Sequence, residues 1–194
     1  MAWIVKVGVN AYLTQSQMEN NATEFYGYFH SKGFTIESIA AMLGNLQQES
    51  NINPGMKQTA SASSGWGLIQ WTPSSNLTDY ATAHGTDWAT GEIQTQLMWD
   101  EIINGYGGQW IPKPAKGYPY TGEEFSQLTN VTTACMAYLI ERERAGVEVA
   151  EKRVAYANAW YEYLTGVTPP TPPTPPTPTK RKRMPVWMMC GPLF

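Results

Sequence analysis

The sequence predicts a mainly helical α+β domain that contains one small β-hairpin and is followed by a Pro-rich tail. Through most of the chain before Gly166, apolar residues recur at a spacing near 3.6, the period of an amphipathic helix. Residues 55–75 lack this period and are rich in Gly, Ser and Thr, which favours a hairpin with a loop. After Gly166 a Thr-Pro repeat begins, which is typical of an extended polyproline spacer. We therefore expect a domain, a linker and a flexible, basic and hydrophobic tail at residues 1–166, 167–179 and 180–194.

The first two predicted helices have recognisable starts and ends. The first follows the potential caps Thr14 and Ser16 and ends at Lys32. The second begins after the cap Thr35 and runs to about Ser50, because the breaker-rich segment NINPG follows it. The apolar stripes of the two helices are Met18, Ala22, Phe25 and Phe29, and Ile36, Ile39, Leu43 and Leu46.

Helical spacing resumes later in the chain, in four further segments. We predict helices at about 90–104, 121–128, 129–144 and 148–165. Thr121 and Glu124 form the pattern of a capping box at the start of the second of these helices. The segment GYGGQWIPKPAKGYPY, residues 105–120, is a long loop, and loops of this length inside compact domains are often functional.

Composition and charge exclude several classes of function. The net charge is −3 and basic residues are scattered up to position 180, so we expect no nucleic acid as a partner. His30 and His84 have no suitably spaced ligand partner, and no Gly-rich phosphate loop is present, so we expect neither a metal nor a cofactor. Cys135 and Cys190 lie in a predicted helix and in the tail, which makes a structural disulfide unexpected. We also expect no signal peptide and no transmembrane segment, because no run approaches the roughly 18 to 20 apolar residues of a membrane span.

Glu49 is the first candidate for chemistry. At about 100° per residue it falls on the margin of the apolar stripe of its helix, beside Met42 and Leu46. A carboxyl that is half surrounded by apolar groups is partly desolvated, which favours its protonated form and lets it deliver a proton to a leaving oxygen. The alternative interpretation is a solvated glutamate at a helix end.

Two motifs stand close together around Glu49. The sequence GNLQQESNINP, residues 44–54, is followed by ASSGWGLIQWTP, residues 62–73. Together they resemble the core of the lysozyme and soluble lytic transglycosylase superfamily, in which the helix-end Glu is the catalytic acid and the Gly-Leu-x-Gln segment lines the sugar cleft. Within that superfamily the chain is similar to the phage tail lysozyme family over roughly residues 11–165. Further markers of this family are AYLTQSQMENNA, MWDEI and AYLIERERAG.

The resemblance implies roles for three residues. Glu49 would be the acid, Gln70 a cleft residue, and Glu141 an acidic site near the cleft. A family-like Glu-Arg-Pro pattern reads Glu141-Arg142-Glu143 in this chain, which leaves the register and role of Glu141 open.

A second catalytic carboxylate is an open question. A retaining glycosidase places one about 5 Å from the acid, and an inverting glycosidase about 6.5 to 9.5 Å away. The candidates are Glu141, Asp79 and Asp87, each of which can instead be a surface or helix-pairing residue. The resemblance also permits a lytic transglycosylase, which manages with one glutamate because the 6-hydroxyl of the sugar attacks.

Side chains that can bind sugars form the second group of candidates. Gln70 offers both a donor and an acceptor, and aromatic rings offer flat apolar faces. The predicted aromatic binding residues are Trp66, Trp71, Tyr80 and Trp110. Trp88, Trp99 and Trp160 are most simply assigned to the core.

These observations predict a peptidoglycan muramidase, a glycoside hydrolase of the β-1,4 bond between N-acetylmuramic acid and N-acetylglucosamine. The rival hypotheses are a lytic transglycosylase, a non-catalytic wall-binding module, and a membrane-active tail. The expected partners are peptidoglycan glycan strands, other phage tail proteins and, through the KRKR tail, an anionic wall polymer or membrane surface. We expect the protein on the phage virion tail, or released to the host cell wall at lysis.

Overall fold

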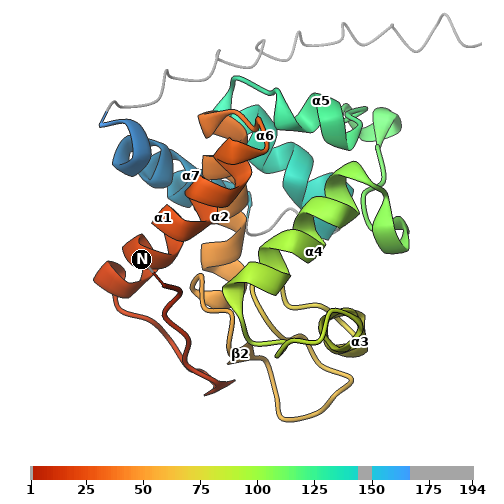
Figure 1. Ribbon diagram of the computed structural model, residues 1–194. Helices are drawn as coiled ribbons and strands as arrows, with labels where there is room; N and C mark the ends of the chain where they lie inside the picture. The colour runs from red at the N-terminus through yellow and green to blue at the C-terminus, as the bar shows by residue number, and fades with distance from the viewer. Residues whose placement is uncertain (1, 144–149, 167–194) are drawn as a thin grey trace, which may run out of the picture.

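The computed structural model describes residues 2–143 and 150–166, and the predicted linker and tail lie outside the described residues. The helices are α1 (Gln15–Ser31), α2 (Ile36–Ser50), α3 (Ser75–Ala83), α4 (Gly91–Ile103), α5 (Gly122–Ser126), α6 (Val131–Tyr138) and α7 (Ala150–Thr165). Shorter helical segments are η1 (Tyr106–Gly108), η2 (Pro114–Lys116) and the π-helical η3 (Leu139–Glu143). Figure 1 shows α1, α2, α6 and α7 in one part of the domain and β2 and α3 in the other, with α4 between them. The predicted mainly helical α+β fold is confirmed.

Helix α2 is the central element of the domain and is buried along most of its length. Every residue from Ser38 to Leu46 is buried, and the helix packs against α1, α5, α6 and α7. Gly44 permits the close contact with α7, because a Cβ at this position would lie 2.6 Å from both the Ala157 backbone nitrogen and the Arg153 carbonyl oxygen. The middle of α2 and the first half of α7 therefore meet backbone to backbone.

The predicted boundaries of α1 and α2 are confirmed. Thr14 caps α1 in a capping box, and the Thr35 hydroxyl caps α2 by accepting a hydrogen bond from the Ser38 N–H at 3.2 Å. Helix α2 ends at Ser50, where Asn51 adopts the left-handed conformation with φ 57°.

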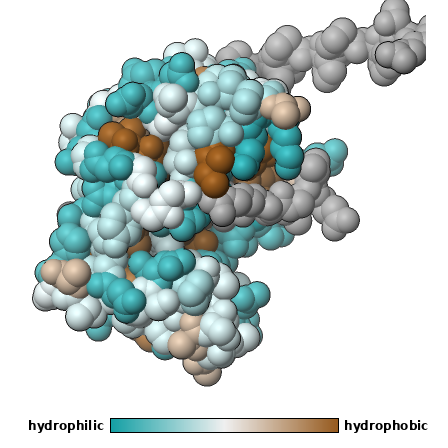
Figure 2. Space-filling view, turned by 90° about the vertical axis from the view of Figure 1, so that its right-hand side faces the viewer, coloured by the Kyte–Doolittle hydropathy of each residue, from teal (hydrophilic) through white to brown (hydrophobic). Residues whose placement is uncertain are grey.

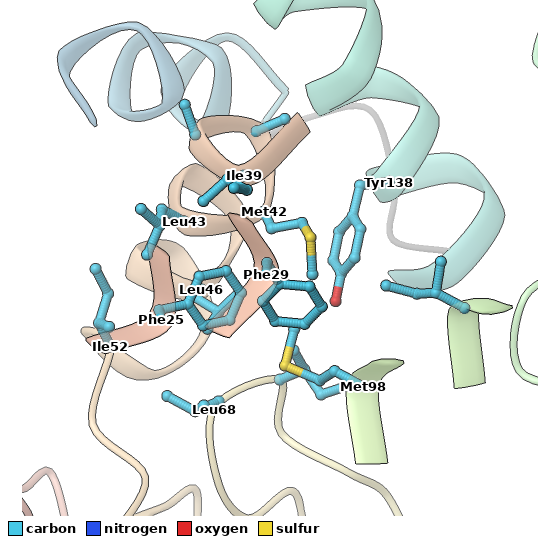
Figure 3. Packing of buried hydrophobic residues seen from close by; sticks show 14 of the residues in the cluster. Phe25, Phe29, Ile39, Met42, Leu43, Leu46, Ile52, Leu68, Met98 and Tyr138 are labelled. Atoms are coloured by element: carbon cyan, nitrogen blue, oxygen red, sulfur yellow. The ribbon is translucent and has the colours of Figure 1, made fainter. Parts of the chain in front are cut away.

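The core lies between the helices. Figure 3 shows side chains of α1, α2 and α6 meeting Leu68 of the segment after β2 and Met98 of α4. The fully buried members include Phe25, Phe29, Ile39, Met42, Leu43, Leu46 and Tyr138. On the face in Figure 2, hydrophilic side chains predominate and hydrophobic patches are small and separate. The apolar surface of the predicted helical stripes is thus mostly inside the domain, where its burial stabilises the fold.

The region after α2 forms the predicted hairpin and adds a strand pairing that was not predicted. Antiparallel bridges join Lys57 to Trp66 and Trp66 to Trp71, which makes the hairpin. In addition, β2 (Met56–Lys57) pairs in parallel with β1 (Gly8–Val9). Two-residue strands carry no local period, so the sequence cannot reveal this pairing. Helix α3 was also missed, because its buried stripe is short: Leu77, Tyr80 and Ala81.

The helix predicted over residues 129–144 is instead α6 followed by η3. The Glu141 carbonyl in η3 accepts a hydrogen bond from the Ile111 N–H at 3.2 Å, so this turn is tied to the long 105–120 loop. Both Glu141 and Arg142 are buried in it. Across the described part of the chain, no helix has the length and apolar character needed to cross a membrane.

Candidate active site

A polar cleft lies where the end of α2, strand β2, the hairpin, η3 and α7 meet. Its cavity volume is about 780 Å³, which is room for several sugar-sized groups. Most of its lining is polar, and the residues that matter for chemistry are Glu49, Lys57, Gln70, Trp71, Arg142 and Lys152. The cleft therefore collects Glu49 with two of the five predicted binding residues.

Glu49 stands in the last turn of α2 and faces this cleft. Its side chain is 22% exposed, and Oε1 forms an ion pair with the guanidinium of Arg153 in α7. Among the described residues, Oε2 has no hydrogen-bond partner. The carboxyl thus has one oxygen held in place and one oxygen available to a ligand in the cleft.

Arg153 is a buried cation that the sequence analysis did not identify. Its side chain is 3% exposed, and Nη1 donates to the Oδ1 of Asn45 at 3.1 Å and to its carbonyl oxygen at 3.4 Å. The expectation for Glu49, drawn from α2 alone, did not include this partner from α7.

Gln70 reaches the cleft because the hairpin turns sharply around it. Its backbone has φ 53°, and its side-chain amide donates to the Gly67 carbonyl at 2.7 Å. Gly65 permits this turn, since a Cβ there would lie 2.7 Å from the Cβ of Gln70. Gln94 of α4 holds the hairpin from inside: its Oε1 accepts from the Leu68 N–H at 2.7 Å and its Nε2 donates to Pro54 at 2.8 Å. Sequence reasoning missed Gln94 because it lies outside the motif.

Trp71 is fixed by a buried ion pair at the cleft. Its Nε1–H donates to Oε1 of Glu101 at 2.9 Å, while Arg142 donates from Nε and Nη2 to Oε2 of Glu101 at 3.0 and 2.8 Å. One carboxylate thereby orients both an aromatic side chain and a guanidinium that line the cleft. The predicted family marker MWDEI contains Glu101, but its spacing gave no hint of this role.

Glu141 lies elsewhere, fully buried behind the long loop. Its Oε1 accepts a hydrogen bond from the Tyr120 N–H at 2.9 Å, and Oε2 has no partner among the described residues. Burial raises the pKa of Glu141 from 4.5 to about 7, although the Tyr120 hydrogen bond acts to lower it. The residue does not line the cleft. Its contacts anchor the loop to η3.

Three of the predicted aromatic binding residues are placed outside the cleft lining. Trp66 packs against Trp88 with ring centroids 4.9 Å apart. Tyr80 is buried and donates its hydroxyl to Asp100. Trp110 packs on Phe125 in the core, 4.8 Å between centroids, and donates to the Tyr120 carbonyl at 3.0 Å. Each ring therefore has a packing partner of its own.

The other candidate carboxylates also lie away from the cleft. Neither Asp79 nor Asp87 lines it, and Asp87 accepts a hydrogen bond from the Ala89 N–H at 2.7 Å in the turn before α4. Among the side chains that the structure describes, those of residues 2–142 and 150–166, Glu49 is the only carboxylate on the cleft lining. The same part of the chain holds no group of three His, Cys, Asp or Glu side chains that could bind a metal ion.

A helical domain whose central helix ends in a glutamate at a polar cleft, opposite a Gly-Leu-x-Gln hairpin, has the features of a lysozyme-like protein. The chain belongs to the phage tail lysozyme family: the model of the family with that description matches residues 20–164, which include all of these elements. This is a family of phage proteins with a lysozyme-like role at the cell wall.

Comparison with a curated protein agrees with this assignment. The chain is 33% identical to Morphogenesis protein 1 of Bacillus phage B103 over 161 residues, which are 81% of this chain and 42% of that protein. The chain thus spans less than half the length of this relative.

Proposed function

We propose that the cleft cleaves the β-1,4 bond between N-acetylmuramic acid and N-acetylglucosamine in peptidoglycan, with Glu49 as the proton donor. The observation that carries this proposal is the position of Glu49, the one carboxylate on the cleft lining of the described chain, at the end of α2 and opposite Gln70. Membership of the phage tail lysozyme family supports it. The relative is named a morphogenesis protein, which fits a virion-associated place for this chain.

In this mechanism the two oxygens of Glu49 have different tasks. Oε1 pairs with Arg153, which fixes the orientation of the carboxyl, and Oε2 carries the proton to the glycosidic oxygen. Glu49 can donate this proton only in its protonated form. Activity should therefore fall as the pH rises.

Trp71 and Gln70 bind the sugar in this proposal. Trp71 offers an apolar ring held by Glu101, and Gln70 offers an amide on a strained turn. Hydrolysis also requires a water molecule beside the sugar, and the polar side chains of the cleft, such as Gln48, Thr72 and Asn76, can orient one.

Lytic transglycosylation is the second candidate, because it needs no carboxylate besides the one on the described cleft lining. Retaining and inverting hydrolysis both use a second carboxyl, about 5 Å or about 6.5 to 9.5 Å from the first. Among the described side chains of residues 2–142 and 150–166, no second carboxylate lines the cleft. Attack by the 6-hydroxyl of the sugar itself needs no second carboxylate.

Mass analysis of digested peptidoglycan tests these possibilities. The wild-type protein should clear a suspension of purified walls and release fragments with reducing-end muramic acid. Anhydromuramic ends, lighter by one water, would instead establish the transglycosylase. Glu92→Gln changes an exposed glutamate of α4 outside the cleft. It is the matched control for Glu49→Gln and should behave as wild type. Wall binding without any released fragment would overturn the glycosidase proposal and favour a binding module.

A further inference from the structure

Positive charge is concentrated at the cleft of a chain that is negative overall. The net charge of the chain is −3. The cleft lining, by contrast, contains Lys57, Arg142 and Lys152 but only one described carboxylate, Glu49. Glu49 is itself paired with Arg153. A field of this sign inside a cleft attracts anionic ligands.

Lys57 is held in place at the cleft by aromatic rings. It lies in β2, and its Nζ is 3.7 Å from the centroid of the Trp66 ring and 5.1 Å from that of Trp88. These contacts orient the ammonium group without neutralising its charge. Trp66 does not line the cleft, but its ring contacts the ammonium group of Lys57, which does line the cleft.

Lys152 supplies a second cation from a different element. It is exposed in the first turn of α7, and its Nζ lies 5.5 Å from the centroid of the Tyr156 ring, which also lines the cleft. Neither Lys57 nor Lys152 forms an ion pair with a carboxylate in the described part of the chain. Arg142 differs, because it shares its charge with Glu101.

We propose that Lys57 and Lys152 bind carboxylates of the substrate, so that the cleft selects muramyl glycan over a neutral polymer of N-acetylglucosamine. This inference rests on the proposed function and names its substrate class. Both polymers have the same β-1,4 backbone and N-acetyl groups. Only the muramyl residue adds a lactyl group, which ends either in a carboxylate or in a stem peptide that carries carboxylates. Lys57 and Lys152 can respond to this difference, because each places a cation on the cleft lining and neither pairs with a carboxylate in the described part of the chain.

Binding measurements separate selection from cleavage. Calorimetry in a Glu49→Gln background would compare three soluble probes: glycan strands with stem peptides, strands stripped to the lactyl carboxylate, and the hexamer of N-acetylglucosamine. We expect the muramyl strands to bind more tightly than the hexamer. Lys57→Gln and Lys152→Gln should each weaken muramyl binding about three-fold, with no change for the hexamer. Higher salt should weaken binding of the muramyl strands alone.

Controls keep this inference falsifiable. Lys116→Gln removes an exposed charge in η2, outside the cleft, and should change nothing. Lys57→Arg should retain the selectivity, which separates loss of charge from loss of fold.

Equal affinity for all three probes would overturn the inference. A loss of affinity in Lys57→Gln that is the same for the hexamer as for the muramyl strands would also overturn it. Selective binding by a protein that cleaves no wall in its wild-type form would leave the inference standing and overturn the proposed function. Tighter binding than the hexamer by strands with stem peptides alone would identify the peptide as the source of the carboxylates. Tighter binding than the hexamer by both kinds of strand would identify the lactyl group.

Discussion

Glu49 and Glu141 were both acidic candidates, and the fold gives them opposite surroundings. Glu49 is 22% exposed, faces a polar cleft and pairs with a buried arginine. Glu141 is 0% exposed, is bound by a backbone N–H, and has no described cation beside it. Burial accordingly raises the pKa of Glu141 to about 7.

The comparison shows that protonation near neutral pH does not by itself identify a catalytic acid. Glu141 can hold a proton at neutral pH, but it lies behind the long loop and cannot touch a polymer in the cleft. Glu49 lines the cleft and is accessible to such a polymer. Perturbed carboxyls gather at active sites, but buried structural carboxyls are perturbed in the same way. Access decides between them here.

The largest effect on stability is expected at a third carboxylate, Glu101, which is buried as Glu141 is and pairs with a buried arginine as Glu49 does. Glu101→Ala leaves Arg142 without this partner and Trp71 without its acceptor. We expect the free energy of unfolding to fall by about 3 to 5 kcal/mol, as measured by urea denaturation. Glu92→Gln on the exposed face of the same helix should change it by less than about 0.5 kcal/mol. Equal midpoints for the two variants would contradict the assigned ion pair.

The buried state of Glu141 predicts a dependence of stability on pH. Its pKa is about 7 in the folded protein against 4.5 as a model value, so the folded state binds more protons between these values. The resulting stabilisation is complete below about pH 4.5 and is lost as the pH rises through about 7. It amounts to about 3 kcal/mol.

Glu141→Gln should remove this dependence of the unfolding free energy on pH. The measurement is urea denaturation of the wild-type protein and of Glu141→Gln at pH 4.5 and pH 7.5. The difference in unfolding free energy between the two proteins should change between the two pH values. Parallel curves for the two proteins would show that Glu141 ionises without penalty and is not buried as described.

Arg153 provides the next test, on the Glu49 side of the comparison. Arg153→Met removes the group that holds Oε1 of Glu49, so the carboxyl loses its fixed orientation and the rate of wall clearing should fall about ten-fold. Arg153→Lys keeps a cation at this position and should retain more of the activity than Arg153→Met. The measurement is the rate of wall clearing by the three proteins on the same purified walls. Equal rates in all three proteins would mean that the ion pair does not position Glu49.

The smallest effect is expected at the loop that Glu141 anchors. Thr121 caps α5 directly after Tyr120, whose N–H is the hydrogen-bond donor to Glu141. Thr121→Ala should lower the free energy of unfolding by about 1 kcal/mol. Thr86→Ala, at an exposed position outside any helix, is the control. No difference between these two variants would mean that the capping box contributes nothing to stability.

Local patterns in the sequence were sufficient for the parts of the site that lie within one element. The stripe of α2 and its cap Thr35 placed Glu49 at a helix end, and the Gly-Leu-x-Gln motif placed Gln70 and Trp71 beside it. Both motifs span fewer than about 15 residues, a range over which periodicity and turn signals are informative.

The partners of these residues were not predictable, because they come from distant parts of the chain. Arg153 meets Glu49 across 104 positions, and Arg142 meets Glu101 across 41. A buried arginine has the same local pattern as an exposed one until the packing of the helices is known. The pairing of β1 with β2 was hidden for the same reason. Aromatic residues such as Trp110 and Tyr80 were equally ambiguous, since a ring that packs and a ring that binds sugar look alike in a sequence.

The central claim is that Glu49, and not Glu141, is the acid that cleaves the glycan strand. Wall clearing by Glu49→Gln and Glu141→Gln, measured side by side with the wild-type protein on the same purified peptidoglycan, tests it most directly. We predict that Glu49→Gln loses about 10²- to 10⁴-fold in rate and that Glu141→Gln keeps most of its activity at a pH where both variants are folded. Full activity of Glu49→Gln, or a larger loss in folded Glu141→Gln, would contradict the claim.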